Sequence, residues 1–174
     1  ATNGGSSSLE RRIILKRIEE LAPHLEIRLL NDGTRADAIV RNNSMDKWLP
    51  IQWKTTSKLR KDRRRLNSYT WNFAGAFGYF GMLLICECED DGSTWVFNGK
   101  DVSQKCLTIS RNSKTYSNEY IGSGCTTAIL CNKIITALAD TKFKLISEET
   151  ARSDFPFSNS HLIEYKSITA WRDV

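Results

Sequence analysis

The sequence predicts a mixed α/β (α+β) fold, and three observations support this. A helical pattern at the start of the chain is followed by three consecutive strand patterns, not by alternating strands and helices. An apolar segment at residues 81–88 is then joined by a turn to a shorter strand pattern. The length of 174 residues suffices for one domain with a sizeable core, but not for two ordinary domains.

A helix is expected over residues 8–22, because apolar residues recur there at the 3.6-residue spacing of one helix face. Pro23 ends this pattern. The apolar positions are Leu9, Ile13, Ile14, Ile18 and Leu21.

Three strands are expected next. Residues 25–30 alternate between apolar and polar side chains and lead into the turn signal Asn31-Asp32-Gly33. Residues 34–41 form the second short strand, and a polar loop separates it from the third strand at 48–55. We therefore expect consecutive antiparallel strands in the first third of the chain.

The remaining elements are less regular. Residues 81–88 read as a buried strand that turns at Asp90-Asp91-Gly92 into a hairpin partner at 93–97. A second long helix is expected over 126–139. The segments 67–80 and 98–124 and the C-terminal tail fit no single pattern.

The expected organisation is a flexible lead at residues 1–7 and one domain over 8–174, with a core at 8–97 and an elaboration at 98–174. The 40% hydrophobic content excludes a disordered chain. No apolar run approaches the roughly 18 residues of a membrane span, and no secretory signal is visible. Five irregularly spaced cysteines indicate reduced, buried thiols rather than a disulfide framework or a zinc site. We expect an intracellular protein of the nucleus or cytoplasm.

The positive charge is concentrated in one block. Residues 54–65 hold seven basic residues and one acid, a net +6, so the rest of the chain carries −1 of the total +5. Such a block is either a solvated face or import signal, or a contact for nucleic-acid phosphates. The residues assigned to phosphate contact are Lys58, Arg60, Lys61, Arg63, Arg64 and Arg65.

Asp37, Gln52 and Lys54 form the candidate catalytic constellation. On a strand, Gln52 and Lys54 share one face, while Ile51 and Trp53 share the other. The apolar face is expected to be core, so the polar face should lie at a surface or cleft. A hairpin with the preceding strand brings Asp37 beside them. A carboxylate and an amide oxygen suit Mg²⁺, and an ammonium suits the attacking water or the charge developing on phosphorus.

At these residues the chain resembles the PD-(D/E)XK nuclease superfamily. Gly33-Thr34-Arg35-Ala36-Asp37 stands where its Pro-Asp strand would be, and Leu49-Pro50-Ile51-Gln52-Trp53-Lys54-Thr55-Thr56-Ser57 resembles its (D/E)XK strand. The resemblance covers residues 8–97 and implies a restriction-endonuclease-like core in α-β-β-β-α-β order, with a mixed sheet flanked by helices. It implies a metal-dependent endonuclease that cuts nucleic acid, with DNA favoured over RNA, and it is compatible with a homodimer.

By this resemblance, Asp37 and Gln52 would hold Mg²⁺ or Mn²⁺ and Lys54 would serve catalysis. The chain departs from the family in two ways: Ala36 replaces the proline, which has no ligand role, and Gln52 replaces an acid, which weakens metal binding. The Gln52 variant keeps a second reading open, in which the chain is a non-catalytic nucleic-acid-binding module that retains the nuclease fold.

Glu10 has two interpretations. Its position on the apolar stripe of the first helix points it inward, and some resolvase-like members of the family supply a metal-binding glutamate from this helix. Glu10 would then be a fourth catalytic and metal-binding residue that restores the charge lost at Gln52. Alternatively, Ser7-Ser8-Leu9-Glu10 is a capping box. The sequence leaves both open.

Overall fold

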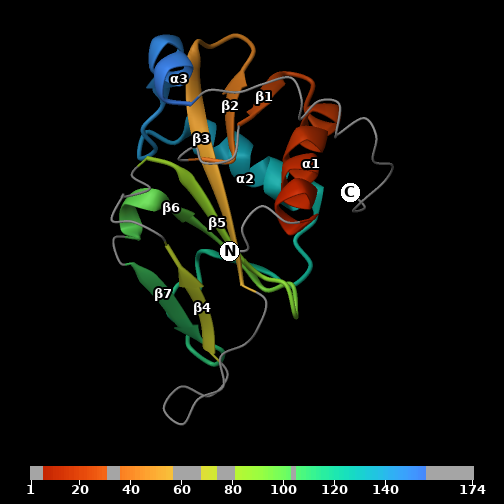
Figure 1. Ribbon diagram of the computed structural model, residues 1–174, viewed down its shortest axis with the longest axis vertical. Helices are drawn as coiled ribbons and strands as arrows, with labels where there is room; N and C mark the ends of the chain where they lie inside the picture. Colours follow the sequence, from red (N-terminus) through yellow and green to blue (C-terminus); the bar gives the residue numbers. More distant parts are fainter. Residues whose placement is uncertain (1–5, 31–35, 57–67, 74–80, 103–104, 156–174) are drawn as a thin grey trace.

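The computed structural model describes residues 6–30, 36–56, 68–73, 81–102 and 105–155 (Figure 1). Its elements in chain order are α1 (Ser6–Leu21), β1 (Leu25–Leu29), β2 (Ala38–Asn42), β3 (Lys47–Thr56), β4 (Ser68–Asn72), β5 (Leu83–Cys88), β6 (Thr94–Asn98), the 3-10 helix η1 (Gly99–Asp101), β7 (Cys106–Ser110), β8 (Tyr120–Gly122), α2 (Thr127–Ala139), β9 (Ile146–Ser147) and α3 (Glu148–Asp154).

The central sheet is mixed. Its strand order is β1-β2-β3-β5-β6-β8, and β9 pairs with the beginning of β3. β1, β2 and β3 are consecutive antiparallel strands, whereas β5 runs parallel to β3 and antiparallel to β6. This topology confirms the mixed α/β class that the sequence predicts.

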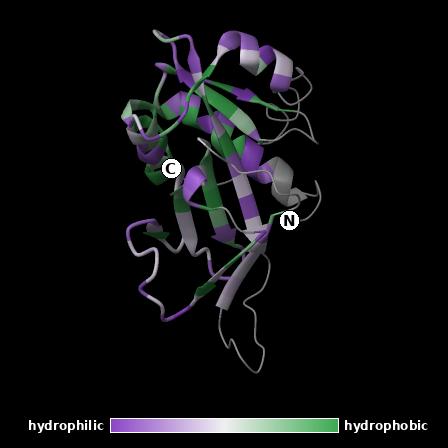
Figure 2. Cartoon of the chain, turned by 90° about the vertical axis from the view of Figure 1, so that its left-hand side faces the viewer, coloured by the Kyte–Doolittle hydropathy of each residue, from purple (hydrophilic) through white to green (hydrophobic). Residues whose placement is uncertain are grey.

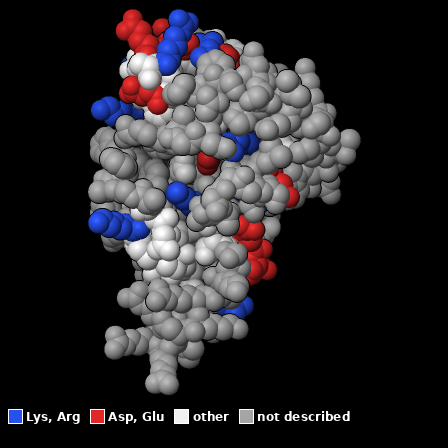
Figure 3. Space-filling view, in the orientation of Figure 1, with Lys and Arg blue, Asp and Glu red and all other residues white. Residues whose placement is uncertain are grey.

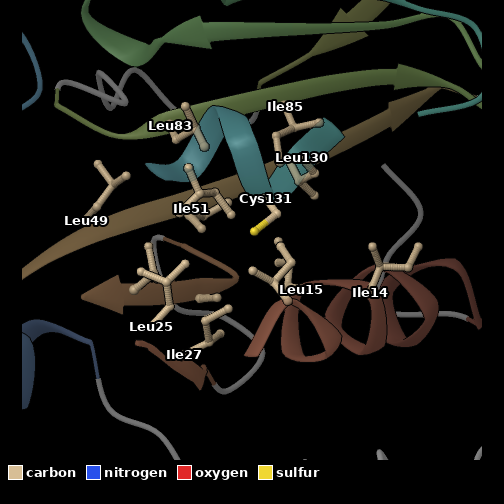
Figure 4. Packing of buried hydrophobic residues seen from close by; sticks show 14 of the residues in the cluster. Ile14, Leu15, Leu25, Ile27, Leu49, Ile51, Leu83, Ile85, Leu130 and Cys131 are labelled. Atoms are coloured by element: carbon tan, nitrogen blue, oxygen red, sulfur yellow. The ribbon is translucent and has the colours of Figure 1, made fainter. Parts of the chain in front are cut away.

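Helices α1 and α2 cover one face of this sheet. Ile14 and Leu15 of α1, Ile51 of β3 and Leu130 of α2 belong to one buried cluster (Figure 4). Hydrophobic residues follow the central strands in Figure 2. Apolar burial of this kind contributes roughly 25 cal/mol per Å². It holds the central sheet, which contains β3, against the two helices.

The opposite face of the sheet is covered at two places. A small antiparallel sheet of β4 and β7 packs Trp71 against the β5–β6 half, which includes Trp95. At the other end, α3 and Phe155 pack near Trp48. All six residues of β5 are buried, as expected for a strand that is covered on both faces.

The first strands and both long helices agree with the sequence-based expectation to within a few residues. The helix at the start begins at Ser6, inside the expected flexible lead, and Leu21 is exposed rather than core-facing. The β2–β3 and β5–β6 hairpins pair as expected.

Between β3 and β5 the described residues form strand β4. The predicted α-β-β-β-α-β order places a helix in this connection. Residues 57–67 and 74–80 of this connection lie outside the described part. The aromatic residues Trp71 and Phe73 are buried in a second hydrophobic cluster.

All five cysteines are free thiols, of which only Cys106 is exposed. Burial raises the pKa of the Cys86 and Cys131 thiols, so these groups stay neutral and serve as core residues. In the described residues, no helix has both the length and the apolar character to cross a membrane.

Candidate active site

Asp37 is held by three hydrogen bonds, two to β3 and one to Leu30, the residue that follows β1. Its backbone N–H donates to the Ile51 carbonyl at 2.8 Å, and its carbonyl accepts from the Leu30 N–H at 2.9 Å. Its side-chain Oδ2 accepts the backbone N–H of Trp53 at 2.8 Å. The carboxylate is therefore fixed beside the one residue that lies between Gln52 and Lys54.

Gln52 and Lys54 alternate along β3 with the buried residues Ile51 and Trp53. The sequence predicts their face to be open. In the structure they are half-buried on a face that is covered near both ends, by the β4–β7 sheet and by α3. Gln52 Oε1 is buried and has no hydrogen-bond partner among the described residues. Leaving such an acceptor unsatisfied costs roughly 1–3 kcal/mol, so this oxygen is suited to an external ligand.

Lys54 neighbours Cys86 of strand β5. It is in register with Cys86 of the parallel strand, which places the two side chains on the same face. Burial raises the pKa of Cys86, and the nearby Lys54 charge acts in the opposite direction. The ammonium of Lys54 is therefore close to a neutral thiol.

Glu10 is not joined to these three residues by any described contact. Its carboxylate lies 3.4 Å from Arg11 Nη1, and its side chain is 40% exposed. Because α1 already begins at Ser6, Ser7 lies inside the helix and not at its N-cap. The capping-box interpretation therefore does not match the start of this helix, and a metal-binding role for Glu10 stays a prediction.

Arg12 is a site residue that the sequence analysis does not identify. Its Nη2 lies 3.9 Å from Asp37 Oδ1, and its side chain is only 8% exposed. The sequence indicates the burial of Arg12 only through its position. Arg12 precedes the buried Leu15 by three residues, which places both on the same side of the helix. A guanidinium beside a carboxylate stabilises the charged form of that carboxylate.

Arg11 belongs to a second buried network beneath the site. Its Nε and Nη2 donate to Glu87 Oε1 at 3.0 and 2.9 Å, and Trp53 Nε1 donates to the same oxygen at 3.1 Å. Glu87 is 3% exposed. This network fixes the indole of Trp53, the residue whose backbone N–H holds Asp37, and it ties α1 to β3 and β5.

Among the described residues, two oxygen-bearing side chains suit a divalent metal ion. Asp37 contributes a positioned carboxylate and Gln52 contributes an amide oxygen without a partner in the described part of the chain. Mg²⁺ commonly takes one or two protein oxygens together with waters and phosphate. Among the described residues, no three His, Cys, Asp or Glu side chains gather at one point. Arg12 adds positive charge near Asp37, which weakens the attraction for a cation.

The predicted phosphate-binding block cannot be placed, because Lys58, Arg60, Lys61, Arg63, Arg64 and Arg65 lie outside the described residues. On the face shown in Figure 3, the described part carries acidic and basic side chains interspersed, most densely at the end where α3 lies. The described part of this face therefore has no continuous basic surface.

The chain is similar to a solved structure but matches no family model and no curated sequence. Among solved structures, the chain is similar to a bacterial homing endonuclease, I-Ssp6803I, with a TM-score of 0.49 and 13% sequence identity. The match covers 79% of this chain and 96% of that one.

Proposed function

We propose that the chain is a metal-dependent endonuclease that hydrolyses phosphodiester bonds of nucleic acid, with DNA the favoured substrate. The observation that supports this most directly is the pairing of Asp37 with the backbone of β3 between Gln52 and Lys54. The arrangement combines a positioned carboxylate, a buried amide oxygen suited to a ligand, and an ammonium on adjacent strands. These are the groups that metal-assisted phosphodiester hydrolysis requires.

In this proposal, Asp37 and Gln52 hold Mg²⁺ or Mn²⁺, and Glu10 is the candidate for a further carboxylate. A bound ion of this kind polarises the phosphoryl oxygen and lowers the pKa of its water. The Trp53 N–H keeps the Asp37 carboxylate in place before any ligand arrives, so little reorganisation is needed.

Lys54 has two chemically reasonable roles in the same reaction. It can orient or help to deprotonate the attacking water, or it can stabilise the negative charge that develops on the phosphoryl oxygens. The basic block at residues 58–65 follows Lys54 directly in the chain and supplies the phosphate contacts that hold the strand across the site.

A second function is a non-catalytic nucleic-acid-binding module. Two observations favour it: Gln52 is neutral where an acid would attract the metal, and the Arg12 guanidinium lies 3.9 Å from Asp37. Both reduce the negative charge available to a cation, whereas neither prevents binding of a phosphate backbone.

The experiment incubates the protein with plasmid DNA, single-stranded DNA and RNA, in Mg²⁺, in Mn²⁺ and in a chelator. Lys54→Ala is compared with Lys47→Ala, which removes an exposed lysine at the other end of the same strand. We expect metal-dependent cleavage by the wild type and by Lys47→Ala, and at least about a hundredfold loss in Lys54→Ala. Binding of nucleic acid without cleavage in either metal would establish the non-catalytic module instead.

A further inference from the structure

A pocket outside the candidate active site lies between the small sheet and the far edge of the central sheet. It has a volume of about 250 Å³ and is lined by Tyr69 of β4, Trp95 of β6, Tyr120 of β8 and the segment that follows β7. This is below the roughly 300–1,000 Å³ of pockets that hold drug-sized ligands. The pocket therefore fits one small group rather than an extended ligand.

One wall of the pocket is aromatic and open to solvent. Tyr120 is 43% exposed, and its ring lies 4.9 Å from that of Trp95. Trp95 in turn packs against Tyr69 at 5.0 Å. Tyr120 is thus an exposed ring supported from behind by a buried aromatic cluster, and such a platform suits the stacking of a planar group.

The rim of the pocket is cationic and rich in hydroxyl groups. Arg111 and Lys114 are exposed, and serine and threonine side chains from the same segment lie between and beside them. The acid near this wall, Asp91, is already engaged, because it accepts the Tyr69 hydroxyl at 2.7 Å and the Ser93 N–H at 2.9 Å. The rim therefore offers positive charge and hydrogen-bond donors to an anion.

The backbone around the pocket is irregular in two places. Tyr116, in the segment that forms the rim, has a φ of 62°, a left-handed conformation that is costly for a bulky residue. Its ring packs edge-on against Phe97 at 5.2 Å, which holds this conformation. The pairing of β6 with β8 also shifts register between Thr94 and Trp95. Strained residues and bulges of this kind concentrate at functional sites.

We propose that this pocket holds one unpaired nucleotide of a nucleic-acid strand, with its base stacked on Tyr120 and its phosphate between Arg111 and Lys114. The combination of an open aromatic ring with a cationic, hydroxyl-rich rim matches the two halves of a nucleotide. This inference rests on the proposed function, since it assumes that the chain binds nucleic acid.

The pocket lies on the same side of the central sheet as Lys54. Lys54, Cys86 and Trp95 are register partners on three adjacent strands and share one face of the sheet. Cys86 and Trp95 are buried there beneath the β4–β7 sheet. A strand that is bound at both places would therefore pass around the small sheet.

The test measures fluorescence anisotropy of a labelled single-stranded DNA of about 12 nucleotides, a length within the usual site size of one domain, in a chelator, so that no cleavage interferes. Tyr120→Ala should weaken binding by about 5- to 150-fold, the range measured for loss of one base–aromatic stack. Tyr120→Phe should bind like the wild type, because it keeps the ring. Ile135→Ala, an exposed apolar residue of α2, is the control and should have no effect.

The cationic rim is tested in the same assay. Arg111→Ser combined with Lys114→Ser should weaken binding more than Lys47→Ser combined with Lys100→Ser, which removes the same charge from exposed lysines that do not line the pocket. Circular dichroism of each variant verifies folding.

Three outcomes overturn the inference. Equal binding by Tyr120→Ala and Tyr120→Phe would exclude stacking, and equal effects of the two double variants would exclude a local phosphate contact. Binding of a free mononucleotide as tight as that of the oligonucleotide would make the pocket a site for free nucleotides and not for a strand. Tyr120-dependent binding by a wild type that cuts nothing would retain the pocket and refute the nuclease.

Discussion

The carboxylate of Asp37 accepts the backbone N–H of Trp53 across 2.8 Å, which fastens the residue before β2 to the middle of β3. Trp53 is itself fixed through its side chain, since its indole N–H donates to the buried Glu87. The candidate metal ligand is thus part of the hydrogen-bonded framework of the sheet. It differs in this from Gln52, whose amide oxygen has no partner within the described part of the chain.

This relationship separates the structural role of Asp37 from its chemical role. Asp37→Asn keeps an acceptor for the Trp53 N–H, so it should lose less free energy of unfolding than Asp37→Ala, although both variants remove the negative charge beside Arg12. Asp37→Ala removes the acceptor and should lose about 1.5–3 kcal/mol, the usual contribution of a hydrogen bond to a charged group. Urea unfolding measures both.

Both Asp37 variants should abolish metal binding and cleavage, because each removes the carboxylate. Calorimetric titration with Mn²⁺ is the measurement for binding. Cleavage by Asp37→Asn at the wild-type rate would show that this carboxylate is structural and that the metal, if any, is held elsewhere.

Arg12 should limit metal affinity. Its guanidinium lies 3.9 Å from the Asp37 carboxylate, and at an effective dielectric constant of about 20 a charge at this distance interacts by about 4 kcal/mol. Arg12→Gln should therefore bind Mn²⁺ at least about tenfold more tightly than the wild type, whereas Arg12→Lys, which keeps the charge, should change affinity less. Titration calorimetry of the three proteins tests this, and equal affinity of Arg12→Gln and wild type would contradict it.

Acid should destabilise the protein through Glu148. The hydrogen bond from the Trp48 indole N–H, together with Arg152 and Arg28, lowers the pKa of Glu148 in the folded chain. A group with a depressed folded pKa stabilises the fold above its unfolded pKa of about 4.3, and this stabilisation is lost as pH falls through the folded value. Thermal unfolding between neutral pH and about pH 3 should therefore show a drop in Tm below about pH 4.3.

The contribution of Glu148 is isolated by two neutralising substitutions. Glu148→Gln should lower Tm at neutral pH and flatten the acid-side fall. Glu149→Gln removes the same charge from the exposed neighbouring residue and should leave the profile unchanged. Parallel profiles for wild type and Glu148→Gln would mean that other acids, such as Asp91, determine the acid transition.

Local periodicity was sufficient to predict α1 and the first three strands, because each of these elements is determined by residues near it in the chain. β4 and β7 were not predicted, because Thr70 pairs with Thr108 and no turn signal joins their two segments. A strand pair of this kind depends on tertiary packing, which a local pattern does not contain.

The site was likewise predictable only in part. Strand alternation was enough to put Gln52 and Lys54 on one face of β3. The burial of Arg11 depends on Glu87, which is 76 residues away, and the neighbour of Arg12 is Asp37 on another element. Two adjacent arginines in a helix are typical of a solvated surface, and only their spacing from Ile14 and Leu15 indicates otherwise.

The basic block should bind phosphates without regard to sequence. Replacing Arg63, Arg64 and Arg65 by glutamine should weaken binding of unrelated DNA sequences to a similar degree. It should also reduce the slope of log K against log salt by about one for each phosphate that these arginines neutralise. The control replaces the exposed lysines Lys47, Lys100 and Lys142 by glutamine. An unchanged affinity and slope in the arginine variant would make the block a solvated face or an import signal.

Gln52 decides between the enzyme and the non-catalytic module, because it is the position where the chain lacks an acid. Gln52→Glu adds a second carboxylate to the candidate site and should raise Mn²⁺ affinity, since hard divalent cations prefer charged oxygen ligands. Gln52→Leu removes the amide oxygen and should weaken metal binding. The same change should leave the free energy of unfolding equal or higher, because the buried acceptor it replaces has no partner among the described residues.

Calorimetric metal titration, urea unfolding and cleavage rates for the wild type and both Gln52 variants therefore form one experiment. If Gln52→Leu destabilises the protein by more than about 1 kcal/mol, then Gln52 Oε1 has a structural partner and is no free ligand. If the wild type binds no metal and cuts no substrate while Gln52→Glu does both, the natural chain is a nucleic-acid-binding module. Its site would then lack only the one negative charge that separates glutamine from glutamate.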